Sequence, residues 1–304
     1  MMNNNWTIKI LDTIAELEMV EDLQRIVWPG SETDVVPAHL LITTVHNGGF
    51  VIGAFPLQNG VNTGGSLVGF AYGFPGIYST PDGPRLKHCS HQLGVHPEYR
   101  GRGLGYKIKR AQWQLVRKQG IDRITWTYDP LLSRNAHLNI TRLGAVCSTY
   151  RREVYGEMRD GLNLGVASDR FEVDWWVNSQ RVNKRLSSKA RSRLDLAHFL
   201  AAEAEIINPT QVDENGWVVP SGSISYGSQS DKTESFPNIL LVEIPSDFPG
   251  LKDADMQLAK EWRKITRMIF EDLFERGYLV TDFVYLPGDF PRSYYVLSHG
   301  EGTF

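Results

Sequence analysis

The stretch that most constrains the fold is "LGVHPEYRGRGLGYKIKRAQWQLVRKQG", from Leu93 to Gly120. Its apolar, strand-like beginning ends at His96-Pro97, and Gly120 is a typical residue just beyond a helix end. The intervening helix is predicted from apolar residues at helical spacing, namely Leu104, Ile108, Ala111 and Leu115. Between strand and helix stands "RGRGLG", with three glycines and two arginines. The stretch therefore predicts a strand–turn–helix unit with an unusual turn.

A glycine-rich turn that opens a helix directs backbone N–H groups toward a bound anion, and the helix dipole adds positive charge. Arg100 and Arg102 add charged donors. Between Glu98 and Arg123 there are eight Arg or Lys residues and only two acids. These features predict a phosphate or pyrophosphate site. The spacing G-x-G-x-G is neither the dinucleotide fingerprint nor a Walker A loop. A plain glycine-rich turn beside a solvated basic helix is the alternative interpretation.

Hydrophobic periodicity and turn residues predict the elements around this unit. The order is β-α-α-β-β-β-α-β-α-β and is complete by about Gly156. The predicted segments are strands at "WTIKIL", "GGFVIGAFP", "SLVGFAYGFP", "RLKHCSHQLGV", "RITWTY" and "STYRREVYG", and helices at 13–28, 37–45, 104–120 and 134–143.

The rest of the chain has weaker signals. We expect a strand at "RFEVDWWV", a basic helix over 183–204, a long polar loop over 209–235, and then "NILLVEIP", a helix through 258–273, "GYLVTDFVYL" and "SYYVLSH". This last strand–helix–strand series echoes the opening one without its Arg-Gly loop. It is either a degenerate second half-domain or a plain α/β cap. The predicted domains are 1–160 and 161–304.

Arg100 to Gly105 matches the R/Q-x-x-G-x-G/A loop of the GNAT superfamily of N-acetyltransferases, and the flanking strand, Pro97 and helix resemble that family's central segment. The resemblance covers about the first half of the chain. It implies an α/β (α+β type) fold, with a mixed, largely antiparallel twisted sheet flanked by helices. It also implies acetyl-CoA or another acyl-CoA as co-substrate.

The resemblance assigns roles to particular residues. Backbone groups of Leu93 and Val95 would pair with the pantetheine arm, and the loop would hold the pyrophosphate. The loop residues are Arg100, Gly101, Arg102, Gly103, Leu104 and Gly105, with Tyr106. The family's usual helix-opening Asn is replaced by Ser133, which leaves Asn135 as the residue expected near the pantetheine.

The family's usual tyrosine acid is also replaced, by Ile140. Tyr150 is the expected substitute on the next strand, with Tyr155 or water as alternatives. Transfer of an acyl group to an amine also needs a base. Strand alternation would place Cys89, His91, Leu93 and Val95 on one face, which makes His91 the first candidate. The alternatives are an inert surface His, Asp129 as base, and Cys89 as nucleophile.

The expected acceptor is a small amine or amino acid. Acids and aromatics in "SDRFEVDWW" (Asp169, Glu172 and Asp174 with Phe171, Trp175 and Trp176) suit a cation, although a strand with one buried face explains the same pattern. The leading prediction is therefore an N-acyltransferase that uses an acetyl, succinyl or other short acyl group. The alternatives are a non-catalytic acyl-CoA-binding regulatory module and a protein or peptide acyltransferase.

Composition narrows the remaining classes. The chain has 304 residues and a net charge of −3, so no general attraction to nucleic acid or membranes is expected. Two cysteines are too few for a disulfide framework. No apolar run approaches a membrane span, and the start lacks a signal-peptide pattern. We expect a cytoplasmic protein without a metal; a homodimer is one assembly that the sequence allows.

Overall fold

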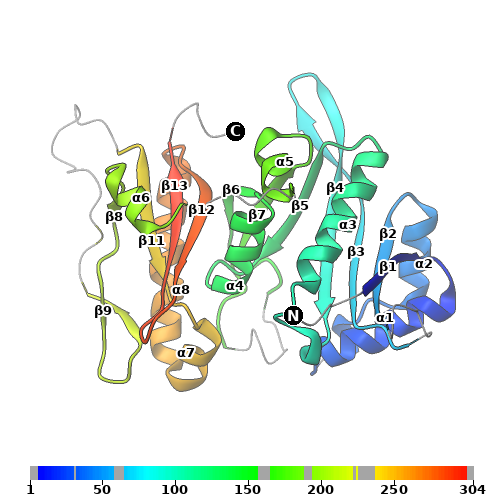
Figure 1. The fold of residues 1–304 in the computed structure, drawn as a ribbon, viewed down its shortest axis with the longest axis horizontal. Coiled ribbons are helices and arrows are strands. Elements are labelled where there is room, and N and C mark those ends of the chain that lie inside the picture. Colours follow the sequence, from blue (N-terminus) through cyan, green and yellow to red (C-terminus); the bar gives the residue numbers. More distant parts are fainter. Residues whose placement is uncertain are drawn as a thin grey trace. The chain divides into compact units, whose positions relative to one another are not determined.

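A computed structural model describes residues 6–30, 32–57, 65–156, 165–187, 194–221, 224 and 237–299 (Figure 1). These residues form two compact units. The N-terminal unit consists of the described residues of Met1–Trp126 with Trp176–Asn178, and the C-terminal unit takes the others. The predicted domain boundary between residues 160 and 161 lies outside the described residues and stays a prediction. Within the described ranges, no helix has the length and apolar character needed to cross a membrane.

The N-terminal unit is built on a sheet of strand order β1-β2-β3-β4-β5. Its neighbours are antiparallel except β4 and β5, which run parallel. The strands are β1 (Trp6–Leu11), β2 (Phe50–Pro56), β3 (Gly69–Thr80), β4 (Gly83–Val95) and β5 (Arg123–Tyr128). The helices are α1 (Ile14–Val27), α2 (Ala38–His46) and α3 (Leu104–Lys118).

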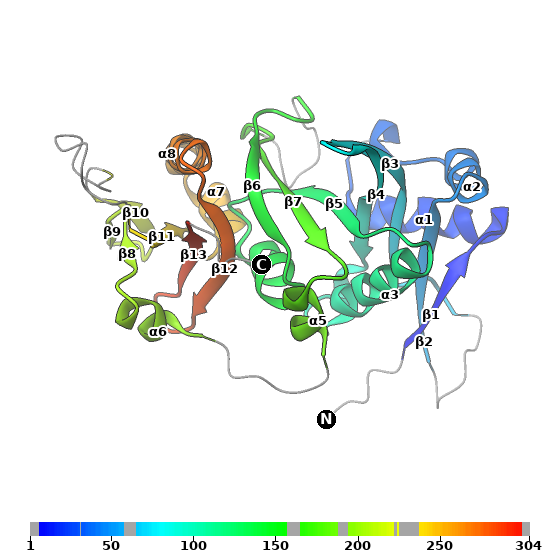
Figure 2. The same ribbon diagram turned by 90° about the horizontal axis from the view of Figure 1, so that it is seen from above.

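Helices cover both faces of this sheet (Figure 2). Phe70 and Tyr72 of β3 belong to a core that α1 and α2 complete. Gly69 points the other way: a Cβ built on it would lie 2.9 Å from Ile108 of α3. The two faces therefore alternate along β3, as the strand pleat requires. At the start of α1, Thr13 and Glu16 form a capping box, which is why the helix begins there.

The C-terminal unit has a second sheet segment, in the order β7-β6-β12-β13-β11-β8. Its strands are β6 (Val146–Arg151), β7 (Arg170–Trp176), β8 (Glu205–Ile206), β11 (Ile239–Ile244), β12 (Leu279–Leu286) and β13 (Arg292–Ser298), and β9 (Thr210–Val212) with β10 (Val218–Pro220) forms a separate hairpin. The helices are α4 (Ser133–Ala136), continued by a π-helical turn over His137–Arg142, α5 (Gln180–Leu186), α6 (Leu196–Ala201), α7 (Phe248–Ala254) and α8 (Met256–Glu275).

Two of these helices pack on opposite faces of the sheet (Figure 2). Phe270 of α8 contacts the ring of Tyr295 at 5.3 Å between centroids. On the other face, Phe199 of α6 packs in a cluster with Tyr294 and Val296. Successive residues of β13 therefore supply two separate cores. Most of the apolar runs predicted as strands are strands, and the mixed, largely antiparallel α/β architecture is confirmed.

Three expectations for the second half need correction. The single helix over 183–204 is wrong: Ser187 ends α5 in extended backbone, and Asp195 caps the separate α6. The described part of the predicted loop over 209–235 contains the β9–β10 hairpin. In addition, β13 lies between β11 and β12, whereas β4 and β5 are direct neighbours. The two strand–helix–strand series therefore differ in strand order.

Candidate active site

The glycine-rich loop in the N-terminal unit has the backbone geometry that an anion site needs. Gly101 and Gly103 have φ of 76° and 77°, a region that favours glycine, and a Cβ built on either would meet no atom within 4 Å. Gly103 caps α3 without any side-chain hydrogen bond. The amides of Leu104 and Gly105 open the helix, so they have no acceptor within it. This geometry gives the loop open space beside its two glycines and two amide donors that the helix itself does not use.

The two arginines of the loop differ in their surroundings. Arg100 is engaged: its Nε donates to the Val95 carbonyl at 3.1 Å and its Nη2 to the Val27 carbonyl at 3.4 Å. It therefore holds the loop against β4 and α1. Arg102 is exposed, and its guanidinium carbon lies 5.4 Å from the centre of the Tyr99 ring. Arg102 is thus the better placed of the two to meet an incoming anion.

The strands β4 and β5 pair over a short distance only. Their parallel register includes His88 with Ile124 and Cys89 with Thr125. Between the described residues of these strands, no pairing continues toward Leu93 and Val95. Those two residues remain paired on their other side, with Ala71 and Gly69 of β3. The end of β4 that leads into the glycine loop therefore presents one backbone edge that β5 does not cover.

A β-bulge changes which side chains of β4 share a face. Ser90 pairs with Gly73 and Gln92 with the adjacent Tyr72, so His91 is the extra residue. The prediction that Cys89, His91, Leu93 and Val95 share one face is wrong, because the bulge shifts the alternation by one residue. Cys89 and His91 lie on the face of Phe74, whereas Leu93 and Val95 lie on the face of α3.

His91 keeps the properties of a base. Its ring lies 5.6 Å from that of Tyr72 and 6.1 Å from that of Phe74, between centroids, although the residue as a whole is exposed. Partial burial lowers the pKa of His91 from 6.5, so the ring is neutral at neutral pH and can accept a proton. By contrast, burial and the nearby Lys109 lower the pKa of His88 to about 3. His88 is fully buried and inert as a base.

The remaining predicted residues belong to the C-terminal unit. Asn135 is half-buried on α4. Ser133, which stands where the family usually has Asn, is buried, and its hydroxyl is 2.9 Å from that of Ser293 on β13. The short α4 is therefore tied to the C-terminal strands.

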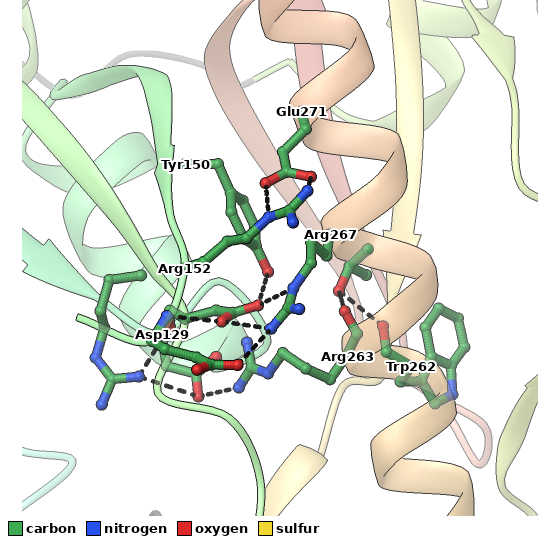
Figure 3. Close-up of polar contacts among 11 residues, drawn as sticks. Asp129, Tyr150, Arg152, Trp262, Arg263, Arg267 and Glu271 are labelled. Carbon is green, nitrogen blue, oxygen red and sulfur yellow. Dashed lines mark hydrogen bonds and ion pairs between the residues drawn. The ribbon is translucent and has the colours of Figure 1, made fainter. Parts of the chain in front are cut away.

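Tyr150 of β6 contacts a charged cluster that includes Asp169 and Arg267 of α8 (Figure 3). Its hydroxyl donates to Asp169 Oδ2 at 2.8 Å, and Arg267 binds both oxygens of Asp169 at 2.7 and 2.8 Å. Burial raises the pKa of Tyr150, so the hydroxyl stays protonated. The nearby Tyr155 instead lies with its hydroxyl 2.7 Å from that of Thr127.

Asp129, the alternative base, is engaged in an ion pair. Arg263 of α8 donates to its Oδ2 at 2.5 Å (Figure 3). The Leu131 amide donates to Oδ1 at 2.8 Å. Asp129 is therefore a structural partner of α8.

Burial raises the pKa of Cys147, the other cysteine, so it stays a thiol.

Most side chains of the predicted cation-binding surface on β7 make contacts within the protein. Asp169 is fully buried with Arg267, and Glu172 pairs with Arg151 at 2.9 Å. Trp175 is buried and donates to the Leu143 carbonyl. The burial pattern along β7 fits the alternative interpretation, a strand with one buried face.

Comparison with known proteins identifies the family of the N-terminal part. Residues 17–140 match the model of the acetyltransferase (GNAT) family. This match includes β4, the glycine loop and α3. This segment, 124 of the 304 residues, is similar to the acetyltransferase (GNAT) family, and acyl-CoA is the co-substrate that the similarity implies. No curated protein matches the chain.

Solved structures with similarity to this chain include three acetyltransferases. Arabidopsis thaliana NAA60 in complex with acetyl-CoA has 14% identity and a TM-score of 0.45, over 57% of this chain and 99% of its own. A GNAT-family protein from Desulfovibrio desulfuricans has 13% identity and a TM-score of 0.42, over 57% of this chain and 99% of its own. The ribosomal-protein-S18-alanine N-acetyltransferase from Escherichia coli has 17% identity and a TM-score of 0.39, over 62% of this chain and 100% of its own. The family assignment rests on the sequence match over residues 17–140.

Proposed function

We propose that this protein is an acyl-CoA-dependent N-acyltransferase that transfers a short acyl group directly to a small amine or amino acid. The observation that carries the proposal is the glycine loop at the end of β4, where two left-handed glycines leave the first amides of α3 open. It lies directly after a strand edge that β5 does not cover. An elongated ligand with a pyrophosphate suits this combination.

In this proposal the donor lies along β4. The backbone of Leu93 and Val95 pairs with the pantetheine arm, and Asn135 contacts the same arm. The pyrophosphate is held by the loop amides, with Arg102 as the added charge. Arg100 braces the loop through its bonds to carbonyl oxygens. The residues assigned to the pyrophosphate remain those of the sequence prediction, Arg100, Gly101, Arg102, Gly103, Leu104, Gly105 and Tyr106.

The chemistry assigned to this site is a direct transfer. Neutral His91 removes the proton of the acceptor ammonium, directly or through water, and the amine then attacks the thioester carbonyl. The C–N bond forms, the C–S bond breaks, the nitrogen loses its second proton to solvent, and the departing thiolate takes a proton from an acid that solvent then restores. Tyr150 is the proposed donor of that proton. Its hydroxyl hydrogen is directed at Asp169, so it has to turn toward the sulfur during the reaction.

A turnover assay tests this function. The purified chain is incubated with acetyl-CoA or succinyl-CoA and a panel of free amino acids, their decarboxylated amines and short peptides, and released thiol is measured. The proposal predicts acceptor-dependent release of CoA with at least one free amine or amino acid. CoA binding without turnover across the panel would instead establish a regulatory module. Release with peptides alone would establish a peptide acyltransferase.

A further inference from the structure

A buried polar network lies between α3 and β4 in the N-terminal unit. Lys109 Nζ donates to Ser90 Oγ at 3.0 Å and to Gln112 Oε1 at 2.8 Å. Ser90 Oγ lies 3.0 Å from Gln112 Oε1, and Gln112 Nε2 lies 3.2 Å from His88 Nε2. All four residues are buried, and Lys109 has only 2% of its surface exposed. Burial lowers the pKa of Lys109 well below its usual value.

The direction of each hydrogen bond follows from the donors. Because Lys109 has no acceptor, it donates to both oxygens, so Ser90 uses its own proton on the Gln112 oxygen. The Gln112 amide nitrogen then donates to His88 Nε2, which must be unprotonated. Each hydrogen bond of the network therefore has a fixed donor and acceptor, and the donors of α3 point toward Ser90 and His88 of β4. His88 is held further by stacking on Phe50, at 4.6 Å between ring centroids.

Lys109 also reaches the neighbouring strand. Its Nζ lies 3.6 Å from the centre of the Trp126 ring on β5, a close cation–π distance. Ser90 and Trp126 are the residues that directly follow the paired Cys89 and Thr125. One side chain thus contacts both strands immediately beyond their last parallel pair. Lys109 lies where β4 and β5 begin to part.

From this placement we infer that Lys109 is a positioning residue, which fixes the separation of β4 and β5 at the base of the opening that receives the donor. The inference rests on the proposed function, in which the pantetheine arm enters between these strands. Burying an amine costs free energy that an apolar side chain of similar length does not. Its contacts with Ser90, Gln112 and Trp126 recover part of that cost only while both strands keep their positions.

The test replaces Lys109 by methionine, which keeps the length but removes the donors, and uses Lys118→Met at the exposed end of the same helix as the control. CoA affinity is measured by calorimetry, and KM for acyl-CoA and for acceptor by steady-state kinetics. Lys109→Met is expected to raise the Kd for CoA and the KM for acyl-CoA about tenfold, roughly the effect of one or two lost hydrogen bonds. The KM for the acceptor and all constants of Lys118→Met should stay within about twofold of wild type.

A second pair of variants covers the case in which Lys109→Met does not fold. Ser90→Ala removes the hydroxyl that Lys109 binds, and Ser90→Thr retains it, so only Ser90→Ala should weaken CoA binding. A general loss of packing would affect both KM values together and would not be rescued by threonine. Wild-type CoA affinity in folded Lys109→Met, or equal affinity in the two Ser90 variants, overturns the inference. Failure of the wild type to bind CoA overturns the proposed function as well.

Discussion

His91, the proposed base, occupies the extra position of a bulge, where its ring faces Tyr72 and Phe74. A base has to be unprotonated, and burial lowers the pKa of His91 below 6.5. The kcat/KM for acyl transfer should therefore rise with pH through a value below 6.5 and then level off. This acidic limb of the pH profile reports the pKa of the free enzyme, and it is measured at subsaturating acceptor.

Replacing the ring tests the same assignment. His91→Gln should lower kcat about 100-fold, the usual size of a lost general base, and should remove the acidic limb. CoA affinity should not change, because the ring is not assigned to the donor. A variant with wild-type kcat, or one that retains the acidic limb, would remove His91 from the mechanism.

Asp169 tests the charged cluster on α8. Burial alone would raise the pKa of Asp169, but bonds from Arg267, the Glu153 amide and Tyr150 outweigh it, so the pKa lies below 3.8. A depressed folded pKa means that the stabilisation is present above about pH 3.8 and is lost as the pH falls through the folded value. Asp169→Asn should cost about 3 kcal/mol at pH 7, since it removes the buried carboxylate that binds Arg267 and leaves only the exposed Glu153, at 3.8 Å, as its acidic partner.

Urea denaturation measures this loss, with Glu172→Gln as the control. Glu172 pairs with Arg151, whose side chain is 56% exposed, so the control should cost under about 1 kcal/mol. Equal losses in the two variants would show that Asp169 is not the anchor of α8.

At the scale of elements, the β3–β4 pair depends on a glycine opposite the bulge. A Cβ on Gly73 would lie 2.3 Å from His88 Nε2 and 2.7 Å from the Cys89 carbonyl oxygen. Gly73→Ala should therefore destabilise the protein by about 1–3 kcal/mol. Gly65→Ala, whose Cβ meets nothing within 4 Å, is the control and should change stability by less than about 0.5 kcal/mol. Thermal or urea unfolding of both variants measures these changes in stability. If Gly73→Ala were as stable as the wild type, His88 would be able to move away from the added Cβ.

Helices and strands up to β6 were predictable because their signals are local. Thr13 and Glu16 mark the start of α1, and the apolar spacing from Leu104 defines α3. The bulge at His91 was not predictable, since one extra residue leaves the composition of a strand unchanged. The short α7 was also missed, although Asp247 caps it and Pro249 stands near its start, which are recognisable signals.

For the molecule as a whole, the glycine turn before α3 was predictable, whereas the surroundings of the catalytic candidates were not. Gly101 and Gly103 belong to one short motif, so their backbone conformation can be predicted from neighbouring residues in the sequence. Asp129 and Arg263 are 134 residues apart, and Asp169 and Arg267 are 98 apart. Charged residues at such separations have many alternative partners in a sequence. Only the fold of the C-terminal unit determines which of them pair.

The proposed function depends above all on binding of the CoA pyrophosphate by the glycine loop. The most direct measurement is calorimetric titration of CoA into the wild type, Gly103→Glu and Gly83→Glu. Both glycines have positive φ and open surroundings, but Gly83 lies in the β3–β4 turn at the far end of β4. We expect the wild type and Gly83→Glu to bind CoA and folded Gly103→Glu not to bind it, since a carboxylate would repel the phosphates. Unchanged CoA affinity in Gly103→Glu would contradict this assignment.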